Sequence, residues 1–330
     1  MSKLIPRGRR DLLLCALSAL VPARVWSAPV QADEFPSHRL RFVVPYPPGS
    51  AADTEARHFG RKLKEITGQP VLIESRPGND GIVAVRAVLE APADGYTVLI
   101  GSSSTLALNA AVFKQLPYDP VKDLKPLTMM MRSPVLLVVP GDSRYKTLAE
   151  LVADAKGHPY ALDYSAGSEG YQFMAELFNE MAGVKTHHIP FNNISEATAA
   201  VATGTVAMAF REVASVQELI QSGKVRGLAV AAEKRVPSLP EVPTAAEAGL
   251  PGFTAYSWVA AMVSANTPKR ITDKLAALMA RIENLPETRQ FNDRMGIETI
   301  RGGPDELHDF QLHEIDLWKR VAKQAKIVRR

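Results

Sequence analysis

The sequence is almost without cysteine, and beyond its first 32 residues it also has no long apolar run. Cys15 is the only cysteine among 330 residues, and it falls inside a segment that looks like an export leader. A chain without that leader can form no disulfide, no thiolate metal site and no cysteine nucleophile. No apolar stretch after residue 32 approaches the ~18 residues of a membrane-spanning helix.

Net charge is likewise missing from the main part of the chain. The whole sequence carries a formal charge of +4, from 39 basic and 35 acidic residues. Residues 1–32 hold five of the basic residues and only one acid, Asp11, so the remaining 34 basic and 34 acidic residues balance. Nucleic-acid binding needs a basic surface on the folded part, so no nucleic-acid partner is expected. The glycine-rich motifs of nucleotide-phosphate sites are absent too.

The first 32 residues follow the pattern of a secretory signal peptide. A basic start is followed by a short apolar stretch over 12–21 and by small residues before Asp33. Ten apolar residues are too few to span a membrane. Arg9 and Arg10 also fit a twin-arginine signal, and both export routes stay open. We therefore expect a cleaved leader over 1–32 and an exported protein.

Short Val/Ile/Leu-rich runs alternate with helical patterns through the first two thirds of the chain. This alternation is typical of parallel sheets covered on both faces, and hence of an α/β fold. The expected strands are 40–45, 70–74, 97–101, 135–139, 161–165, 188–191, 206–210 and 225–231. The expected helices are 53–67, 82–90, 148–155, 172–182, 195–203 and 213–221.

The C-terminal third changes character, because helical patterns alone follow an apolar segment over 251–265. The expected helices are 271–283, 287–294 and 305–326, the last with one apolar face. Helices that follow an α/β block often cover an earlier domain. We therefore expect one lobe from 33–134 plus 256–330, a second from 135–255, and crossovers at 133–140 and 253–258.

Four strand-to-helix turns share one design, in which small or hydroxyl residues stand between the strand and the helix. They lie at 46–53, 101–105, 165–170 and 191–195. In parallel sheets such turns gather at the carboxyl ends of the strands, where α/β folds bind ligands. Free backbone N–H groups there suit a carboxylate. Plain helix capping explains any single turn, but four in series favour a binding cleft.

One turn also resembles the nucleophile elbow of serine hydrolases, which would make Ser168 a nucleophile. None of the later histidines, His187, His188, His308 and His313, stands in an evident catalytic loop. The same histidines lack the spacing of a metal site, so no metal is expected.

The order and spacing of several short motifs resemble one family, the extracytoplasmic solute receptors of tripartite tricarboxylate transporters, often called Bug receptors. The motifs are Pro45-Tyr46-Pro47-Pro48-Gly49, Gly68-Gln69-Pro70-Val71, Glu74-Ser75-Arg76-Pro77-Gly78, Asp94-Gly95-Tyr96-Thr97, Leu116-Pro117-Tyr118-Asp119-Pro120, Leu239-Pro240-Glu241-Val242-Pro243-Thr244 and Tyr256-Ser257-Trp258. The resemblance covers the whole chain after the leader.

This resemblance implies a type II periplasmic-binding-protein fold, with two α/β lobes, two crossover segments and a ligand cleft. It implies no catalysis and no cofactor, a small carboxylate ligand, integral-membrane permease subunits as partners, and a monomer. Carried over by motif, the ligand-binding residues would be Tyr46, Gly49, Ser50, Ala51, Asp53, Ser102, Ser103, Thr105, Ser165, Ala166, Gly167, Ser168, Phe191, Asn192, Phe210 and Arg211.

The departures from the family pattern point to ligand choice. The family usually has an acid after the phenylalanine of the strand near 210, whereas this chain has Arg211-Glu212. An arginine can bind a carboxylate through two hydrogen bonds, each worth about 1.5–3 kcal/mol. We therefore expect Arg211 either to clamp a second carboxylate of the ligand or to turn outward toward Glu212 or solvent. Asp53 fits a helix cap better than ligand contact, unless the ligand carries an ammonium group.

Three functions remain open at this point. A periplasmic receptor that delivers a small organic acid to a tripartite tricarboxylate-type transporter is favoured. An exported serine hydrolase that uses Ser168 is the alternative from another class. A receptor that passes its ligand state to a membrane signalling protein would have the same ligand-binding part.

Overall fold

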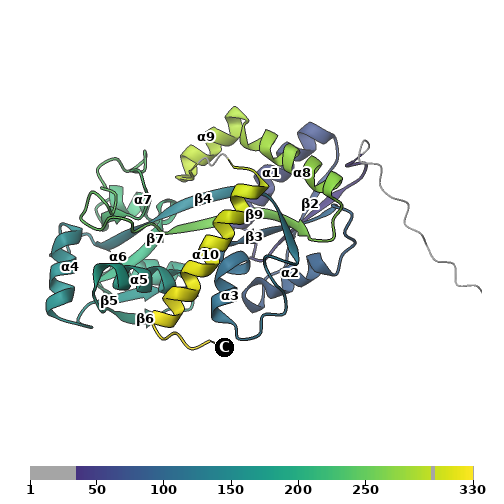
Figure 1. Ribbon diagram of the computed structural model, residues 1–330. Helices are drawn as coiled ribbons and strands as arrows, with labels where there is room; N and C mark the ends of the chain where they lie inside the picture. Colours follow the sequence, from purple (N-terminus) through teal and green to yellow (C-terminus); the bar gives the residue numbers. More distant parts are fainter. Residues whose placement is uncertain (1–34, 299–301, 330) are drawn as a thin grey trace, which may run out of the picture.

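The computed structural model describes residues 35–298 and 302–329, so the predicted leader with Cys15 lies outside the described residues. The first lobe begins with alternating strands and helices (Figure 1). Its elements are β1 (Leu40–Val44), α1 (Ala51–Thr67), β2 (Val71–Ser75), the 3₁₀ turn η1 (Asn79–Gly81), α2 (Ile82–Leu89), β3 (Thr97–Ser102), the π-helical turn η2 (Ser104–Leu108) and α3 (Asn109–Val112).

A long strand then leads into the second lobe, which repeats the alternation before the chain returns. The elements of this part are β4 (Leu124–Pro140), α4 (Leu148–Gly157), β5 (Asp163–Ala166), α5 (Glu169–Ala182), β6 (His187–Pro190), α6 (Ile194–Ala202), β7 (Met208–Glu212), α7 (Val213–Gln221) and β8 (Val225–Val230). The returning elements are β9 (Tyr256–Ser264), α8 (Lys269–Glu283), α9 (Pro286–Met295) and α10 (Pro304–Gln324). None of the helices in the described ranges has the length and apolar character needed to cross a membrane.

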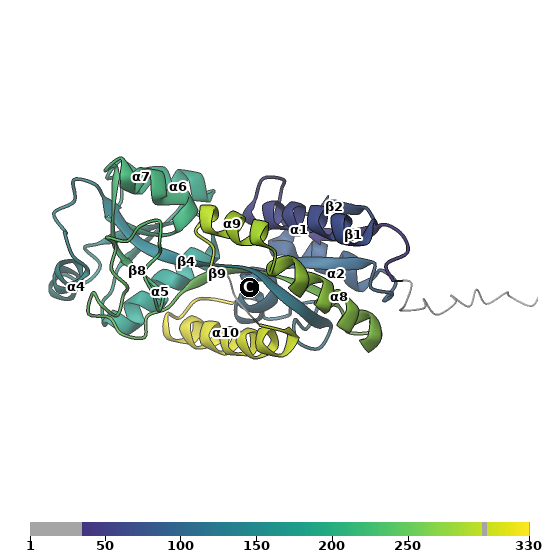
Figure 2. The same cartoon turned by 90° about the horizontal axis from the view of Figure 1, so that it is seen from above.

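The strands form two sheets that share β4. The order is β2-β1-β3-β9-β4-β7-β5-β6, with β8 also beside β4. The first half of β4 pairs with β9, whereas Val135–Pro140 pairs with β7 and β8. The α/β fold class is confirmed, and the lobe boundaries predicted at 134/135 and 255/256 stay a prediction. Figure 2 shows the two lobes side by side, joined by β4 and β9.

The expectation of parallel sheets is wrong for the joining strands. β1 lies parallel to β2 and β3, and β5 lies parallel to β6 and β7, as βαβ units require. β4 and β9 are antiparallel to each other, because one carries the chain out of the first lobe and the other brings it back. Both are also longer than the crossovers expected at 133–140 and 253–258.

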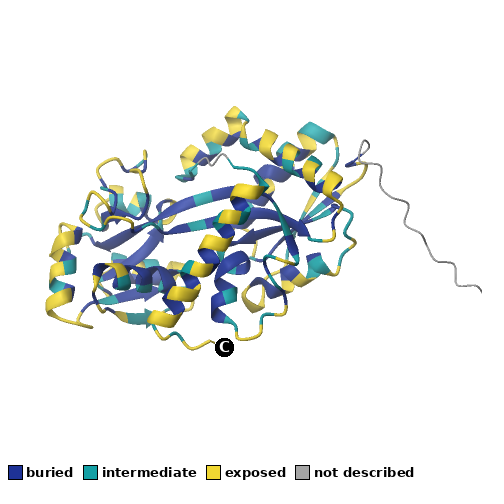
Figure 3. Cartoon of the chain, viewed as in Figure 1, coloured by how far each residue is buried: buried dark blue, intermediate teal, exposed yellow. Residues whose placement is uncertain are grey.

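Helix α10 packs across both lobes and holds the joining strands in place (Figure 1). The indole N–H groups of Trp258, on β9, and Trp318, on α10, both donate to the Glu314 carboxylate, at 3.0 and 3.1 Å. Burial raises the pKa of Glu314, and these two indole donors partly oppose that rise. The strands lie inside and the exposed residues lie on the outer faces of the helices (Figure 3).

Candidate ligand site

A cavity of about 330 Å³ lies between the two lobes. Its volume falls at the lower end of the range for small-molecule sites. From the first lobe it is lined by Tyr46, Ser50, Ala51, Ala52, Asp80, Ser102, Ser103, Ser104, Leu108 and Asn109. From the second lobe it is lined by Ser168, Glu169, Gly170, Tyr171, Met174, Ile194 and Glu212, and from the joining strands by Met131, Ser257 and Val259.

The start of α1 forms one part of the first-lobe wall. Ser50 caps this helix, since its Oγ accepts the Asp53 N–H at 3.2 Å. The Asp53 carboxylate accepts the Gly49 N–H at 2.9 Å and two guanidinium N–H groups of Arg57 at 2.8 and 3.0 Å. Arg57, with the Gly49 N–H, lowers the pKa of Asp53. Asp53 therefore builds the turn. The first backbone N–H groups of a helix have no partner within it, and in α1 the residues that carry them, Ala51 and Ala52, line the cavity.

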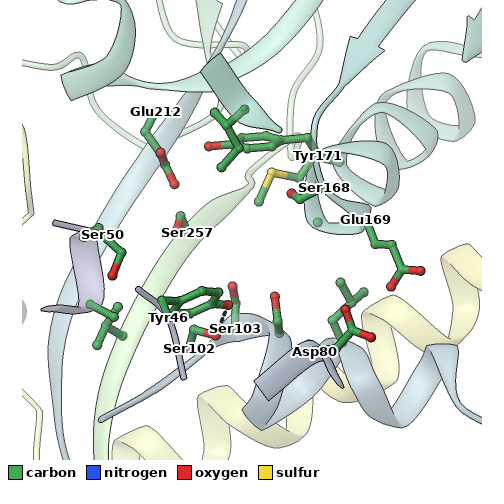
Figure 4. Close-up of a pocket in the computed structure, with 18 of the residues that line it drawn as sticks. Tyr46, Ser50, Asp80, Ser102, Ser103, Ser168, Glu169, Tyr171, Glu212 and Ser257 are labelled. Carbon is green, nitrogen blue, oxygen red and sulfur yellow. Dashed lines mark hydrogen bonds between the residues drawn. The ribbon is translucent and has the colours of Figure 1, made fainter. Parts of the chain in front are cut away.

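The turn after β3 forms the other part of this wall. The Tyr46 and Ser102 hydroxyls lie 2.7 Å apart (Figure 4). Thr105 is buried and fixes the turn, because its Oγ1 accepts the Ser102 N–H at 3.0 Å. The Tyr118 hydroxyl donates to the Thr105 carbonyl at 2.6 Å. The turn thus presents Ser102 and Ser103 to the cavity on a rigid support.

The second-lobe wall is built around the start of α5. Ser168 is the N-cap residue of this helix, but its side chain makes no capping hydrogen bond, and it lines the cavity. Gly167 is required just before it, because a Cβ there would lie 2.2 Å from the Asn193 carbonyl oxygen. The turn after β5 and the start of α6 therefore touch backbone to backbone, which places both helix ends at the cavity.

Arg211 does not face the cavity, in contrast to the expected clamp, nor does it turn outward. Its side chain is fully buried, with Nε donating to Thr198 Oγ1 at 2.8 Å and Nη2 donating to Ser165 Oγ at 3.0 Å. Burial lowers the pKa of Arg211, and the charge of Glu212 opposes this effect. The guanidinium therefore links β7 to β5 and α6. Of the two neighbours Arg211 and Glu212, only Glu212 lines the cavity.

The joining strands form the remaining side of the cavity. Successive residues of a strand point to opposite faces, so Ser257 and Val259 of β9 line the cavity while Trp258 points toward α10. An aromatic contact from Trp258 to a ligand is therefore excluded in this arrangement. Met131 of β4 adds a flexible apolar side chain beside them.

The structure brings six of the residues predicted for ligand binding to the cavity wall: Tyr46, Ser50, Ala51, Ser102, Ser103 and Ser168. Ligand contact by them stays a prediction. The others are not among the lining residues: Gly49, Asp53, Thr105, Ser165, Ala166, Gly167, Phe191, Asn192, Phe210 and Arg211.

Several of these ten residues lie behind the cavity wall and support the turns that form it. Ser165 Oγ donates to the Ala197 carbonyl at 2.7 Å, and the Phe191 N–H donates to the Ala166 carbonyl at 3.0 Å. Phe210 packs against other aromatic rings in the core of the second lobe. They hold together the turns that present the lining residues.

The lining residues that sequence analysis missed come mostly from places without a turn signal. Tyr171 and Met174 stand on one face of α5, three residues apart, and such spacing is equally typical of core residues. Asp80 and Asn109 come from short turns that the expected elements did not include. The turns already singled out contain five of the missed residues: Ala52, Ser104, Glu169, Gly170 and Ile194.

The described residues offer little support for catalysis or for a metal. No histidine is among the described residues that line the cavity, so Ser168 has no such base beside it. The described ranges also contain no group of three or more histidine, cysteine, aspartate or glutamate residues that could hold a metal ion.

Comparison with known proteins adds a family match. The family model described as "Tripartite tricarboxylate transporter family receptor" matches residues 56–327. The chain is 33% identical to "UPF0065 protein in tcbD-tcbE intergenic region" of Pseudomonas sp. strain P51, over 97% of this chain and 95% of the relative. It is 31% identical to BugT of Bordetella pertussis, over 95% and 97%.

Two solved structures have similar folds. The R. palustris protein Rpa4515, solved with adipate, has a TM-score of 0.78 and 31% identity, covering 88% of this chain and 98% of that one. MatC from Rhodopseudomonas palustris, solved with bound malate, has a TM-score of 0.74 and 30% identity, covering 87% and 99%.

Proposed function

Since the chain belongs to the family of tripartite tricarboxylate transporter receptors, we propose that it binds a small organic acid between its lobes in the periplasm. The bound acid is then delivered to integral-membrane permease subunits. The relatives solved with adipate and malate support a carboxylate ligand. In this proposal the chain has no catalytic role.

One observation carries the proposal. The start of α1 and the serine turn after β3 face the start of α5 across the cavity (Figure 4). The first N–H groups of a helix lack partners within it and carry its partial positive charge, so they favour an anion. The hydroxyls of Tyr46, Ser102, Ser103 and Ser168 can add hydrogen bonds.

Binding would be coupled to movement of the lobes. The two lobes each supply part of the wall, so a ligand contacts both only when they are close. β4 changes its partners between Pro134 and Val135, and this is where a hinge would bend. A ligand that contacts both lobes shifts the population toward the closed form, which the permease would recognise.

A thermal-shift screen of the chain without its leader tests this function. The screen covers mono-, di- and tricarboxylates, aromatic acids and amino acids. At a ligand concentration about 100 times Kd, a binding partner stabilises the folded chain by about 2.7 kcal/mol. If no acid raises the unfolding temperature, the proposed function is wrong. Hydrolysis of a nitrophenyl ester that is lost in Ser168→Ala would favour the hydrolase instead.

A further inference from the structure

The end of helix α9 touches the second lobe at one glycine. α9 lies between the helices of the first lobe and α7 (Figure 2), and Gly296 follows its last turn in a left-handed conformation, with a φ of 63°. A Cβ at Gly296 would lie 2.7 Å from Cγ1 and 3.0 Å from Cβ of Val213, the first residue of α7. In this arrangement no side chain fits at this position between α9 and α7.

Gly296 is fixed to the first lobe on both sides in the sequence. Before it, the Thr288 hydroxyl of α9 lies 2.9 Å from Nε2 of His58 on α1, within hydrogen-bond distance. After it, the Glu298 N–H donates to the Arg132 carbonyl of β4 at 2.8 Å, and Arg132 Nε donates to the Glu298 carboxylate at 2.8 Å. The glycine therefore cannot retreat from the second lobe without disturbing these contacts.

Val213 is equally fixed in the second lobe. Its side chain is fully buried and belongs to the same apolar cluster as Leu136 and Val216. A valine has one strongly preferred rotamer in a helix, and rotation of its side chain would not move the Cβ atom that lies 3.0 Å from the added one. A methyl group on Gly296 would therefore push the two lobes apart, because closely packed groups transmit strain.

The contact lies beside the ligand cavity but outside it. Glu212, the residue before Val213, lines the ligand cavity. Gly296 lines a second cavity, of about 470 Å³, between the loop after β8 and the joining strands. Neither Val213 nor Gly296 is among the described residues that line the ligand cavity. A change at this contact therefore alters the approach of the lobes without altering a group that a ligand would touch.

We propose that Gly296 is a positioning residue for ligand capture, because its missing side chain lets the second lobe close until Val213 meets α9. This inference rests on the proposed function, since only a ligand held by both lobes depends on how closely they approach. A chain whose lobes are held apart populates the closed form less, and its apparent affinity falls by the same fraction. That fraction is a property of the chain, so it should be the same for every acid that the closed form binds.

Calorimetric titration of Gly296→Ala tests this assignment. The probes are hexanoate, adipate, citrate, benzoate and glutamate, one for each class of acid in the thermal-shift screen. Each probe that binds the native chain is titrated into the variant. We expect every such acid to bind at least about tenfold more weakly, by a common factor, and tenfold corresponds to about 1.4 kcal/mol.

A glycine elsewhere in the chain provides the matched control. Gly183 ends α5 with φ and ψ of 64° and 41°, close to the 63° and 30° of Gly296, but nothing lies within 4 Å of a Cβ added there. Gly183→Ala therefore introduces the same left-handed backbone strain without the contact between the lobes. Both variants should lose stability in urea unfolding, and Gly183→Ala should bind the acids as the native chain does.

A second substitution tests the contact from the other lobe. Val213→Ala in the Gly296→Ala chain removes Cγ1, the atom nearest to the added methyl group, and should restore at least half of the lost affinity on a logarithmic scale. If Gly296→Ala does not fold, Val213→Ile lengthens the side chain that faces Gly296 and should produce the same loss of affinity.

The outcomes separate this inference from the proposed function. Native affinity in Gly296→Ala, an equal loss in Gly183→Ala, a different factor for each acid or no recovery with Val213→Ala would each overturn the role of Gly296, while the receptor function stands. If no acid binds the native chain, the proposed function is wrong and this inference is wrong with it.

Discussion

Replacing Gly167 by alanine places a methyl group inside the backbone of a neighbouring turn. The added Cβ would lie 2.2 Å from the Asn193 carbonyl oxygen and 2.5 Å from the Ile194 nitrogen. Non-bonded heavy atoms pack at about 3.5 Å, so one of the two backbones must move by roughly 1 Å. No side-chain rotation can relieve the contact, because these atoms belong to the main chain. Overpacking of this kind costs about 1–3 kcal/mol of folding free energy.

The same movement disturbs the cavity. Ser168 follows Gly167 directly, and Ile194 starts α6, and both line the cavity. We therefore expect Gly167→Ala to lower the free energy of unfolding in urea and to weaken binding of the cognate acid by about tenfold or more in calorimetry.

Gly141→Ala is the matched control. An added Cβ at Gly141 would lie 1.8 Å from the Gly223 carbonyl oxygen, so it also meets the main chain. Neither Gly141 nor Gly223 is among the residues that line the cavity. This variant should lose a similar amount of stability and keep its affinity. Unchanged stability and unchanged affinity in Gly167→Ala would refute the reasoning, and equal loss of affinity in both variants would show that binding follows stability alone.

Two further variants test buried ionisable side chains. Arg211→Ala removes the charge-assisted hydrogen bonds to Thr198 and Ser165, each worth about 1.5–3 kcal/mol. Its unfolding free energy should therefore fall by about 3 kcal/mol in urea, and a loss below about 1 kcal/mol would contradict this role. Burial raises the pKa of Glu55 from 4.5 to about 8, so the folded chain holds a proton that the unfolded chain releases, and stability falls as pH rises from about 4.5 to 8. Glu55→Gln should flatten that decline in unfolding measured across this pH range, and an unchanged slope would count against it.

The strands and helices of the α/β units are predicted well from the sequence because their local signals agree. The first strand and helix show this: the helix expected over 53–67 begins at Ala51, where Ser50 caps it, and ends before Gly68 in a left-handed conformation. Short Val/Ile/Leu runs between amphipathic helices have few other ways to bury their apolar faces. Capping residues and periodicity therefore suffice for α/β units.

The joining strands are harder to predict, because their partners lie far away in the sequence. β4 and β9 pair over 120 residues apart, for example at Leu124 and Ser264. Nothing within the apolar segment at 251–265 tells how long the strand is or which lobe it joins. The length and the antiparallel direction follow from pairing, which local patterns do not contain.

Arg211 shows why side-chain direction limits site prediction. Adjacent strand residues point to opposite faces, so an error of one position exchanges a buried residue for a lining one. Helices cover both faces of β7, and the packing of Thr198 and Ser165 decides that the guanidinium lies inside. Glu212 stands at the end of the strand and reaches the cavity.

A crystal structure of the chain with the acid that gives the largest thermal shift tests the central claim most directly. The account predicts the acid between the lobes, with a carboxylate within hydrogen-bond distance of the Ala51 or Ala52 N–H group and of a hydroxyl of Ser102 or Ser103. An acid bound outside the cavity between the start of α1 and the start of α5 would contradict it.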